Sequence, residues 1–272
     1  MTKTLFLLIS IIILNFGIIS ISYSEISQQT HLTTQASLKN NGDYVRTRFL
    51  QNMKKPFTDT QKKKALIIGD SHAQDFFNGI LENNLLSHYQ ISTRYIPTRC
   101  QIFLADDMLR FTNNEDRELC IKSDSLLHAQ EQIEQADLII LVASWREWSA
   151  RELPKTLRNM RINSKQKLFV IGRKSFSKPL LNYSKIQSKD ELVKIRNHVD
   201  AHQLKINQIM KDSLDKGLFI NLHQLICGDM STTCPAFSDD LKIISFDGGH
   251  FTKEGARYII KILFNKSPLG HL

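Results

Sequence analysis

Apolar residues gather along this chain in short, nearly continuous runs that are separated by longer stretches with helical spacing. Runs that are apolar at almost every position are typical of strands covered on both faces. They predict five strands, at residues 65–69, 91–96, 137–143, 167–172 and 218–221. The remaining apolar residues recur at helical spacing and predict helices at residues 73–86, 123–135, 151–160, 190–214 and 253–264.

Strands that alternate with helices of this length predict an α/β domain of three layers, α/β/α, with a central parallel five-stranded sheet. The domain is expected over residues 63–272, which is long enough for one large core, and no Pro/Gly/Ser-rich linker divides it. In such open sheets, functional groups gather in the loops at the carboxyl ends of the strands.

The N-terminal segment has a different pattern. Lys3 precedes an apolar run over residues 5–21, and the small residues Ser22 and Ser24 follow, which predicts a signal peptide over residues 1–24. The run is nearly long enough to span a bilayer, so an uncleaved N-terminal anchor is the alternative. Residues 25–62 are polar and predict an extended, partly ordered leader. The chain is therefore expected to be exported to the periplasm or cell envelope.

The four cysteines fit an oxidising compartment. Nearest-neighbour pairing, one of three possible pairings, predicts the disulfides Cys100–Cys120 and Cys227–Cys234. A zinc site is the rival interpretation, but neither pair has the short spacing of a zinc knuckle.

A second metal candidate is the pair His198 and His202, four positions apart on a predicted helix. That spacing can chelate a metal, but no third ligand is evident. We interpret both as surface residues and expect no metal site.

The formal net charge of +9 suits an acidic surface, an anionic glycan or anionic lipid. No aromatic–basic motif accompanies this charge, so nucleic acid is not an expected partner.

Two short segments carry the candidate chemistry. Ser71 follows the first strand where a helix should begin, so the positive end of that helix faces its hydroxyl. Asp247 and His250 lie three positions apart in a glycine-containing loop near the C-terminus. A serine nucleophile needs a base, and a histidine base needs a carboxylate that orients it. If the fold brings these three residues together, they indicate a serine-dependent ester hydrolase or acyl transferase.

Each segment also has an ordinary interpretation. Asp70 or Ser71 is a common kind of helix N-cap, and His250 taken alone is a loop histidine. The combination of both segments in this order and fold type is what favours catalysis.

The chain resembles the SGNH hydrolase superfamily in these same segments. Residues 66–72 read Leu-Ile-Ile-Gly-Asp-Ser-His, residues 247–256 read Asp-Gly-Gly-His-Phe-Thr-Lys-Glu-Gly-Ala, and a late cysteine pair lies between them. The match is closest to the SGNH domains that accompany multi-pass membrane acyltransferases in bacterial envelopes, and it covers residues 63–265. The resemblance implies that Ser71 is the nucleophile, His250 the general base and then acid, and Asp247 its orienter, with no cofactor.

The chain departs from the superfamily at the oxyanion hole. An asparagine of a Gly-x-Asn motif is expected after the third strand, but residues 143–148 read Ala-Ser-Trp-Arg-Glu-Trp. Loss of one oxyanion donor costs about 3–4 kcal/mol of transition-state stabilisation, so a substitute donor is expected. We predict the main-chain N–H of Ser71 as the first donor, and the Ser144 hydroxyl or the Trp145 main-chain N–H as the second.

Substrate-binding roles are hypotheses for His72, Trp145 and Arg146. His72 follows the nucleophile, and both a role in shaping the site and a surface role are open. An exposed Trp145 indole would stack on a sugar, although tryptophans more often pack inward. Arg146 belongs to a basic region that suits an anionic glycan, although a solvated helix face is the more ordinary explanation.

Three functions follow from these observations. The first is an O-acyltransferase that passes an acyl group from Ser71 to hydroxyls of an envelope polysaccharide, with a separate membrane acyltransferase supplying the acyl group. The second is a carbohydrate acetyl-esterase with the same triad and water as acceptor. The third is a weakly catalytic glycan-binding or scaffolding module, which the intact triad argues against and the missing asparagine favours.

Overall fold

The structure is a computed structural model that describes residues 38–105, 107, 109–176, 186 and 188–272. The predicted signal peptide lies outside these residues. Five parallel strands form the central sheet in the order β2-β1-β3-β4-β6. Their bounds are β1 Lys63–Gly69, β2 Tyr89–Tyr95, β3 Leu138–Val142, β4 Lys167–Ile171 and β6 Phe219–Ile220. Each strand lies within a few residues of its predicted position.

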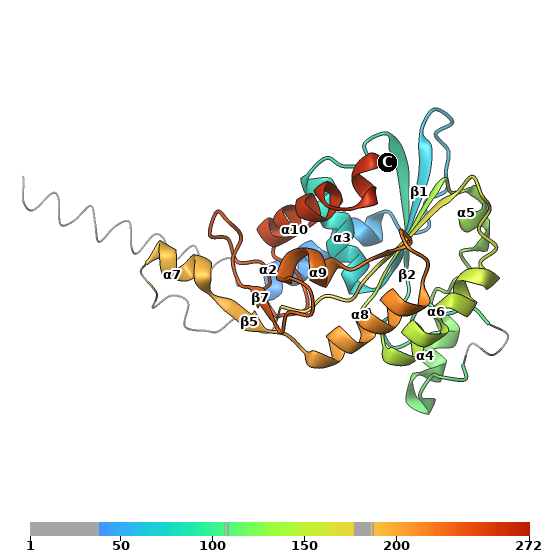
Figure 1. The fold of residues 1–272 in the computed structure, drawn as a ribbon. Coiled ribbons are helices and arrows are strands. Elements are labelled where there is room, and N and C mark those ends of the chain that lie inside the picture. The colour runs from blue at the N-terminus through green and yellow to red at the C-terminus, as the bar shows by residue number, and fades with distance from the viewer. Residues whose placement is uncertain (1–37, 106, 108, 177–185, 187) are drawn as a thin grey trace, which may run out of the picture.

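Helices cover both faces of this sheet (Figure 1). Helices α3 (Ser71–Glu82) and α10 (Lys253–Asn265) pack on one face. Helices α5 (Gln130–Gln135), α6 (Glu147–Asn159) and α8 (Ala201–Ser213) pack on the other. This arrangement confirms the predicted three-layer α/β/α fold.

The side chains of β1 alternate between these two cores. Ala65 and Ile67 belong to the core under α3 and α10, whereas Leu66 and Ile68 belong to the core under α5, α6 and α8. All four are fully buried, and burying one large aliphatic side chain stabilises a fold by about 1.5–3 kcal/mol. The apolar run therefore suits an interior strand, and β1 lies between β2 and β3.

Helices α3 and α10 approach each other closely at Gly79. A Cβ atom at this position would lie 2.1 Å from Cγ1 of Ile260 and 2.7 Å from the carbonyl oxygen of Ala256. Any larger side chain would force the two helices apart. The glycine therefore sets the spacing between α3 and α10.

The predicted helix over residues 190–214 is wrong, because the structure divides it into three elements. These are α7 (Lys189–Lys194), β5 (Arg196–His198) and α8. Strand β5 pairs antiparallel with β7 (Thr233–Pro235), and the Asp200 carboxylate caps α8 by accepting from the N–H of His202. His198 and His202 therefore do not share a helix.

The predicted helix over residues 123–135 also needs correction. The structure has α4 (Arg117–Lys122) before it and α5 only over its second half. The turn between them is held by the Asp124 carboxylate, which accepts from the N–H of Ser125 and from the buried guanidinium of Arg94. The remaining short elements are η1 (Asn114–Asp116), α9 (Leu222–Cys227) and η3 (Pro268–His271).

The prediction of an extended leader over residues 25–62 needs correction at residues 38–51, which form helix α2 (Leu38–Gln51). The Asn78 amide of α3 donates to the carbonyl oxygens of Tyr44 and Val45, and Phe49 of α2 is fully buried against Phe77. This helix is therefore part of the folded core.

Disulfides join Cys100 to Cys120 and Cys227 to Cys234, which confirms the nearest-neighbour pairing. Such bonds fit an extracellular protein. Within the part of the chain that the structure describes, every helix is too short or too polar to cross a membrane.

Candidate active site

The candidate nucleophile lies where β1 meets α3. Strand β1 ends at Gly69, where a Cβ atom would lie 1.7 Å from the carbonyl oxygen of Val142, so glycine is required for β1 and β3 to close at this edge. Helix α3 then begins at Ser71. Asp70 is its N-cap and accepts a 2.9 Å hydrogen bond from the N–H of His72. The backbone thus presents Ser71 at the carboxyl edge of the sheet, as predicted.

The buried carboxylate of Asp70 ties this junction to two further strand ends. It accepts from the Thr98 hydroxyl at 2.8 Å, after β2, and from the N–H of Ser144 at 2.9 Å, after β3. Burial raises the pKa of Asp70, and the hydrogen bonds from His72, Thr98 and Ser144 oppose that shift. The Ser144 N–H is therefore occupied, and the two groups that we predicted as the second oxyanion donor, the Ser144 hydroxyl and the Trp145 main-chain N–H, are not the ones that Asp70 binds.

The candidate acid–base pair lies in the loop before α10. The Nδ1 atom of His250 lies 2.6 Å from Oδ2 of Asp247. The other carboxylate oxygen of Asp247 accepts from the N–H groups of His250 and Gly249, at 2.7 and 2.8 Å. Burial acts to raise the pKa of Asp247, but the hydrogen bonds from His250 and Gly249 outweigh it and lower this pKa to about 2. An ionised Asp247 favours the tautomer in which Nδ1 carries the proton and Nε2 accepts one.

The rest of this loop is held by side chains. The Ser245 hydroxyl donates to the carbonyl oxygen of His250 at 2.6 Å and accepts from the N–H of Gly248 at 2.9 Å. The ring of Phe246 stacks on the His250 ring, with centroids 5.9 Å apart. The imidazole therefore has a defined orientation although no helix or strand carries it.

The two sides of the site meet at α3. The His72 and His250 rings are in edge contact, with centroids 6.3 Å apart, and Asp75 of α3 accepts a hydrogen bond from the N–H of Phe251. Ser71 is partly exposed beside this contact. Its hydroxyl and the His250 ring are not hydrogen-bonded to each other in this structure, and in unliganded enzymes such contacts are often long. The pairing of Ser71 with His250 therefore remains part of our proposal.

His72 is buried, with only 6% of its surface exposed. Burial, followed by the positive charges of Lys174, His250 and Arg173, holds the pKa of His72 well below its ordinary value. A neutral imidazole against His250 fits the interpretation in which His72 shapes the site, and its burial excludes a surface role.

The two tryptophans after β3 both pack against other side chains or main chain, Trp145 fully buried and Trp148 partly exposed. Trp145 is fully buried, and its indole N–H donates to the carbonyl oxygen of Ile171 at 2.8 Å, so its ring offers no face to a sugar. Trp148 stacks on Phe111 with centroids 4.9 Å apart. Arg146 is partly exposed, and its N–H donates to the Gln101 side chain.

Sequence reasoning missed several residues around the site. Lys174 lies after β4 and forms a buried ion pair with Asp75 of α3, and Gln101 bridges the carbonyl oxygens of Thr98 and Ser144. The position of Lys174 just past a strand end was a signal, but a charge there is ordinarily solvated. Asp75 lies one helical turn after Ser71, in a segment interpreted only as helix.

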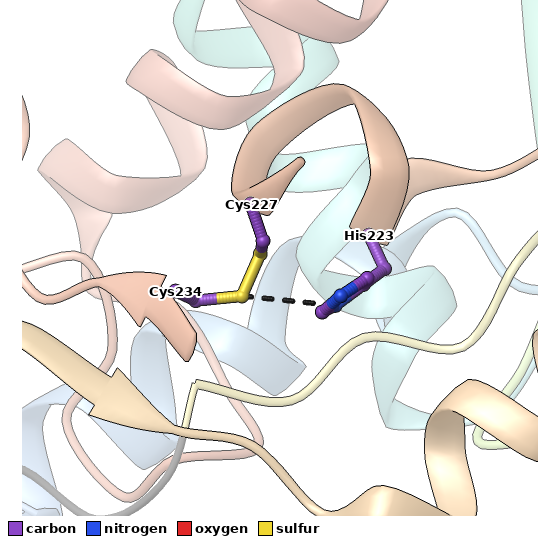
Figure 2. Close-up of side chains that lie close together, drawn as sticks. All are labelled: His223, Cys227 and Cys234. Carbon is purple, nitrogen blue, oxygen red and sulfur yellow. Dashed lines mark hydrogen bonds between the residues drawn. A yellow bond between two sulfur atoms is a disulfide. The ribbon is translucent and has the colours of Figure 1, made fainter. Parts of the chain in front are cut away.

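The second disulfide lies beside a histidine (Figure 2). His223, Cys227 and Cys234 have their potential ligand atoms within 4.8 Å of one another. Both sulfurs are bonded to each other, however, and metals bind thiolates. Nε2 of His223 lies 2.8 Å from the Ser231 carbonyl oxygen, and Nδ1 lies 3.0 Å from the Gln203 amide nitrogen. With the disulfide formed, the cluster is a packed and hydrogen-bonded histidine beside a covalent bridge.

Comparison with known proteins agrees with this geometry. A search of curated proteins gives no match. The family model described as an SGNH domain fused to AT3 domains matches residues 37–264, which confirms the resemblance seen in the sequence. The match includes both candidate motifs and begins one residue before α2. The chain therefore belongs to the SGNH domain family, which indicates an enzyme of the hydrolase or acyltransferase type.

Proposed function

We propose that this protein is an exported serine-dependent O-acyltransferase that acts on hydroxyl groups of envelope polysaccharide. The observation that carries the proposal is the 2.6 Å contact between Asp247 and His250, in a loop that contacts the helix beginning at Ser71. A histidine oriented by a carboxylate is what a serine needs for attack on an ester carbonyl.

The first half of the reaction loads Ser71. Nε2 of His250 takes the proton of the Ser71 hydroxyl while Oγ attacks the carbonyl carbon of the acyl donor. The main-chain N–H of Ser71 at the start of α3, with the Ser144 hydroxyl or the Trp145 N–H, stabilises the oxyanion. The intermediate collapses, His250 returns the proton to the leaving group, and the acyl group stays on Ser71.

The second half transfers the acyl group. A glycan hydroxyl attacks the acyl-serine while Nε2 of His250 takes its proton. Collapse of the second intermediate forms the new ester, and His250 returns the proton to Ser71. Asp247 stays ionised throughout, because its pKa of about 2 lies far below neutral pH. Water in place of the glycan hydroxyl would make the protein an esterase.

The family description supports a separate acyltransferase as the source of the acyl group. Because the matching SGNH domains are described as fused to AT3 domains, we propose that a membrane acyltransferase supplies the acyl groups. The net charge of +9 and the partly exposed Arg146 near the site favour an anionic glycan as acceptor.

The first test is covalent labelling by a fluorophosphonate probe. Wild type and Ser213→Ala, which changes an exposed serine at the end of α8, should be labelled, and Ser71→Ala should not. Absence of labelling in the wild type would support a glycan-binding or scaffolding module instead.

The second test separates transfer from hydrolysis. Acetyl release from an activated ester is measured with and without an envelope oligosaccharide. Transfer predicts that acetylated oligosaccharide accumulates while free acetate falls by the same amount. Release of free acetate that does not respond to the oligosaccharide would contradict transfer and favour the esterase.

A further inference from the structure

A lysine and a carboxylate form a buried ion pair behind the candidate site. Nζ of Lys174 lies 2.6 Å from Oδ2 of Asp75, and their side chains are 3% and 0% exposed. Burial raises the pKa of Asp75, and the Lys174 ammonium opposes that shift. Taking two charges out of water costs several kcal/mol per ion, and their attraction often does no more than offset this cost. A pair at this depth therefore calls for a role beyond stability.

The contacts of this pair surround His250. Lys174 also donates to the carbonyl oxygen of Gly249, the residue before His250, and its Nζ lies 4.3 Å from the ring centre of Phe251. Asp75 accepts a 3.2 Å hydrogen bond from the N–H of Phe251, the residue after His250. The pair thus contacts the chain on both sides of the candidate base.

The same pair is attached to the helix of the candidate nucleophile. Asp75 lies four residues after Ser71 in α3, and residues with that spacing share one face of a helix. Lys174 follows β4, whose last residue pairs with Val142 of β3 at the same sheet edge. Three segments far apart in the sequence therefore meet at one ion pair.

We propose that Lys174 and Asp75 are positioning residues that hold the His250 loop against α3 and so set the distance from the imidazole to the Ser71 hydroxyl. The inference rests on the proposed function, because it gives His250 the role of base. Neither side chain takes part in proton transfer. The pair acts through Gly249 and Phe251, and its loss changes where the imidazole lies.

The test is a comparison of Lys174→Met, Asp75→Leu and the double variant. Each single change leaves one buried charge without its partner and should lower the melting temperature. The double change replaces the ion pair with an apolar pair of similar volume, and such a replacement often keeps the stability of the wild type. Positioning predicts that the double variant melts close to wild type while its kcat on an activated acetyl ester stays at least about tenfold lower, with KM changed less than about threefold. If kcat recovers together with the melting temperature, the pair is structural only and the proposal is overturned.

A second measurement does not depend on activity. Amide hydrogen exchange of the peptide that covers residues 248–251 should be faster in the double variant, while exchange in β1 and β3 is unchanged. Unchanged exchange at residues 248–251 would overturn the proposal even if the protein had no turnover. The matched control is the exposed pair Glu118 and Lys122 of α4, changed to glutamine at both positions, which should alter neither exchange nor kcat.

These readouts distinguish a failure of the positioning role from a failure of the proposed function. If wild type is labelled at Ser71 and the double variant has wild-type kcat, the proposed function stands and the positioning role fails. If wild type is not labelled, the proposed function fails, and the exchange experiment still decides whether the pair anchors the loop.

Discussion

The candidate nucleophile and the candidate base are held in place in different ways. Ser71 lies at a junction of strand and helix, so main-chain hydrogen bonds and the Asp70 cap position it. His250 lies in a loop whose shape depends on the side chains of Asp247, Ser245 and Lys174. Groups on regular elements are positioned more rigidly than groups on loops. Removal of one comparable contact should therefore lower activity more in the loop that carries His250 (the loop side) than at the strand–helix junction that carries Ser71 (the junction side).

The largest expected effect comes from removing either reacting group. Ser71→Ala and His250→Ala should each lower kcat on an activated ester by at least about a thousandfold, because the two groups act as a unit. The double variant should be no slower than the slower single variant. Steady-state kinetics checks this expectation. Near-full turnover of His250→Ala would show that His250 is not the general base.

The two disulfides allow a comparison of stability. Cys100–Cys120 spans 20 positions and closes the loop after β2, whereas Cys227–Cys234 spans 7 positions and precedes the candidate base loop. Alanine at both positions should cost about 3 kcal/mol for the first bond and about 2 kcal/mol for the second.

Chemical denaturation measures these losses. Activity at 25 °C should fall more in the Cys227→Ala, Cys234→Ala variant, although its loss of stability is smaller. A larger loss of activity in the Cys100→Ala, Cys120→Ala variant would contradict the expectation that the His250 loop is the more sensitive of the two sides.

Two single hydroxyl groups sharpen the comparison further. Ser245→Ala removes two hydrogen bonds within the His250 loop, and Thr98→Val removes one to the Asp70 cap. Each should cost about 1 kcal/mol of stability. The first should lower kcat about tenfold and the second less than about threefold, since displacement of a reacting group is what slows the reaction. Equal effects on kcat would show that the loop is as rigid as the junction.

The smallest expected effect concerns pH. The pKa of His72 in the folded protein lies well below its ordinary value of about 6.5, mainly because the ring is buried. The unfolded chain therefore binds a proton below that pH that the folded protein does not. Above pH 6.5 the ring is neutral in both states, so the free energy of unfolding keeps its full value. As the pH falls below 6.5, the free energy of unfolding decreases, by about 1 kcal/mol over the first unit.

A pH series of denaturation curves for wild type and His72→Gln checks this expectation. The stability of wild type relative to the variant should decrease between pH 7 and pH 5. A constant difference would mean that the imidazole already accepts a proton in the folded state.

The strands could be predicted because their signal is local. Each parallel strand is an apolar run covered on both faces, and this pattern survives in any such sheet. The break within residues 190–214 could not, because β5 exists through its pairing with β7, more than 30 residues away. Helix α2 was missed because its first residues include Asn40, Asn41 and Gly42, which are poor helix formers, and its stability comes from packing on α3.

The candidate site also has residues that could be predicted from the sequence and residues that could not. Asp247 and His250 are three positions apart, so their contact follows from a local turn and could be predicted as a motif. Lys174 and Asp75 are 99 positions apart, and no spacing or composition connects them. The burial of Trp145 agrees with the usual inward packing of tryptophan, but the sequence did not identify its partner, because the indole N–H donates to Ile171, 26 positions away.

The missing side chain at Gly79 has a consequence for catalysis. Ser71 begins α3 about 12 Å before this glycine, given the rise of a helix, and α10 begins three residues after His250. A single methyl group at position 79 would wedge the two helices apart and carry the hydroxyl and the imidazole with them. In the mechanism that we propose, the distance between the Ser71 hydroxyl and the His250 ring therefore depends on the absence of a side chain two turns along α3 from Ser71.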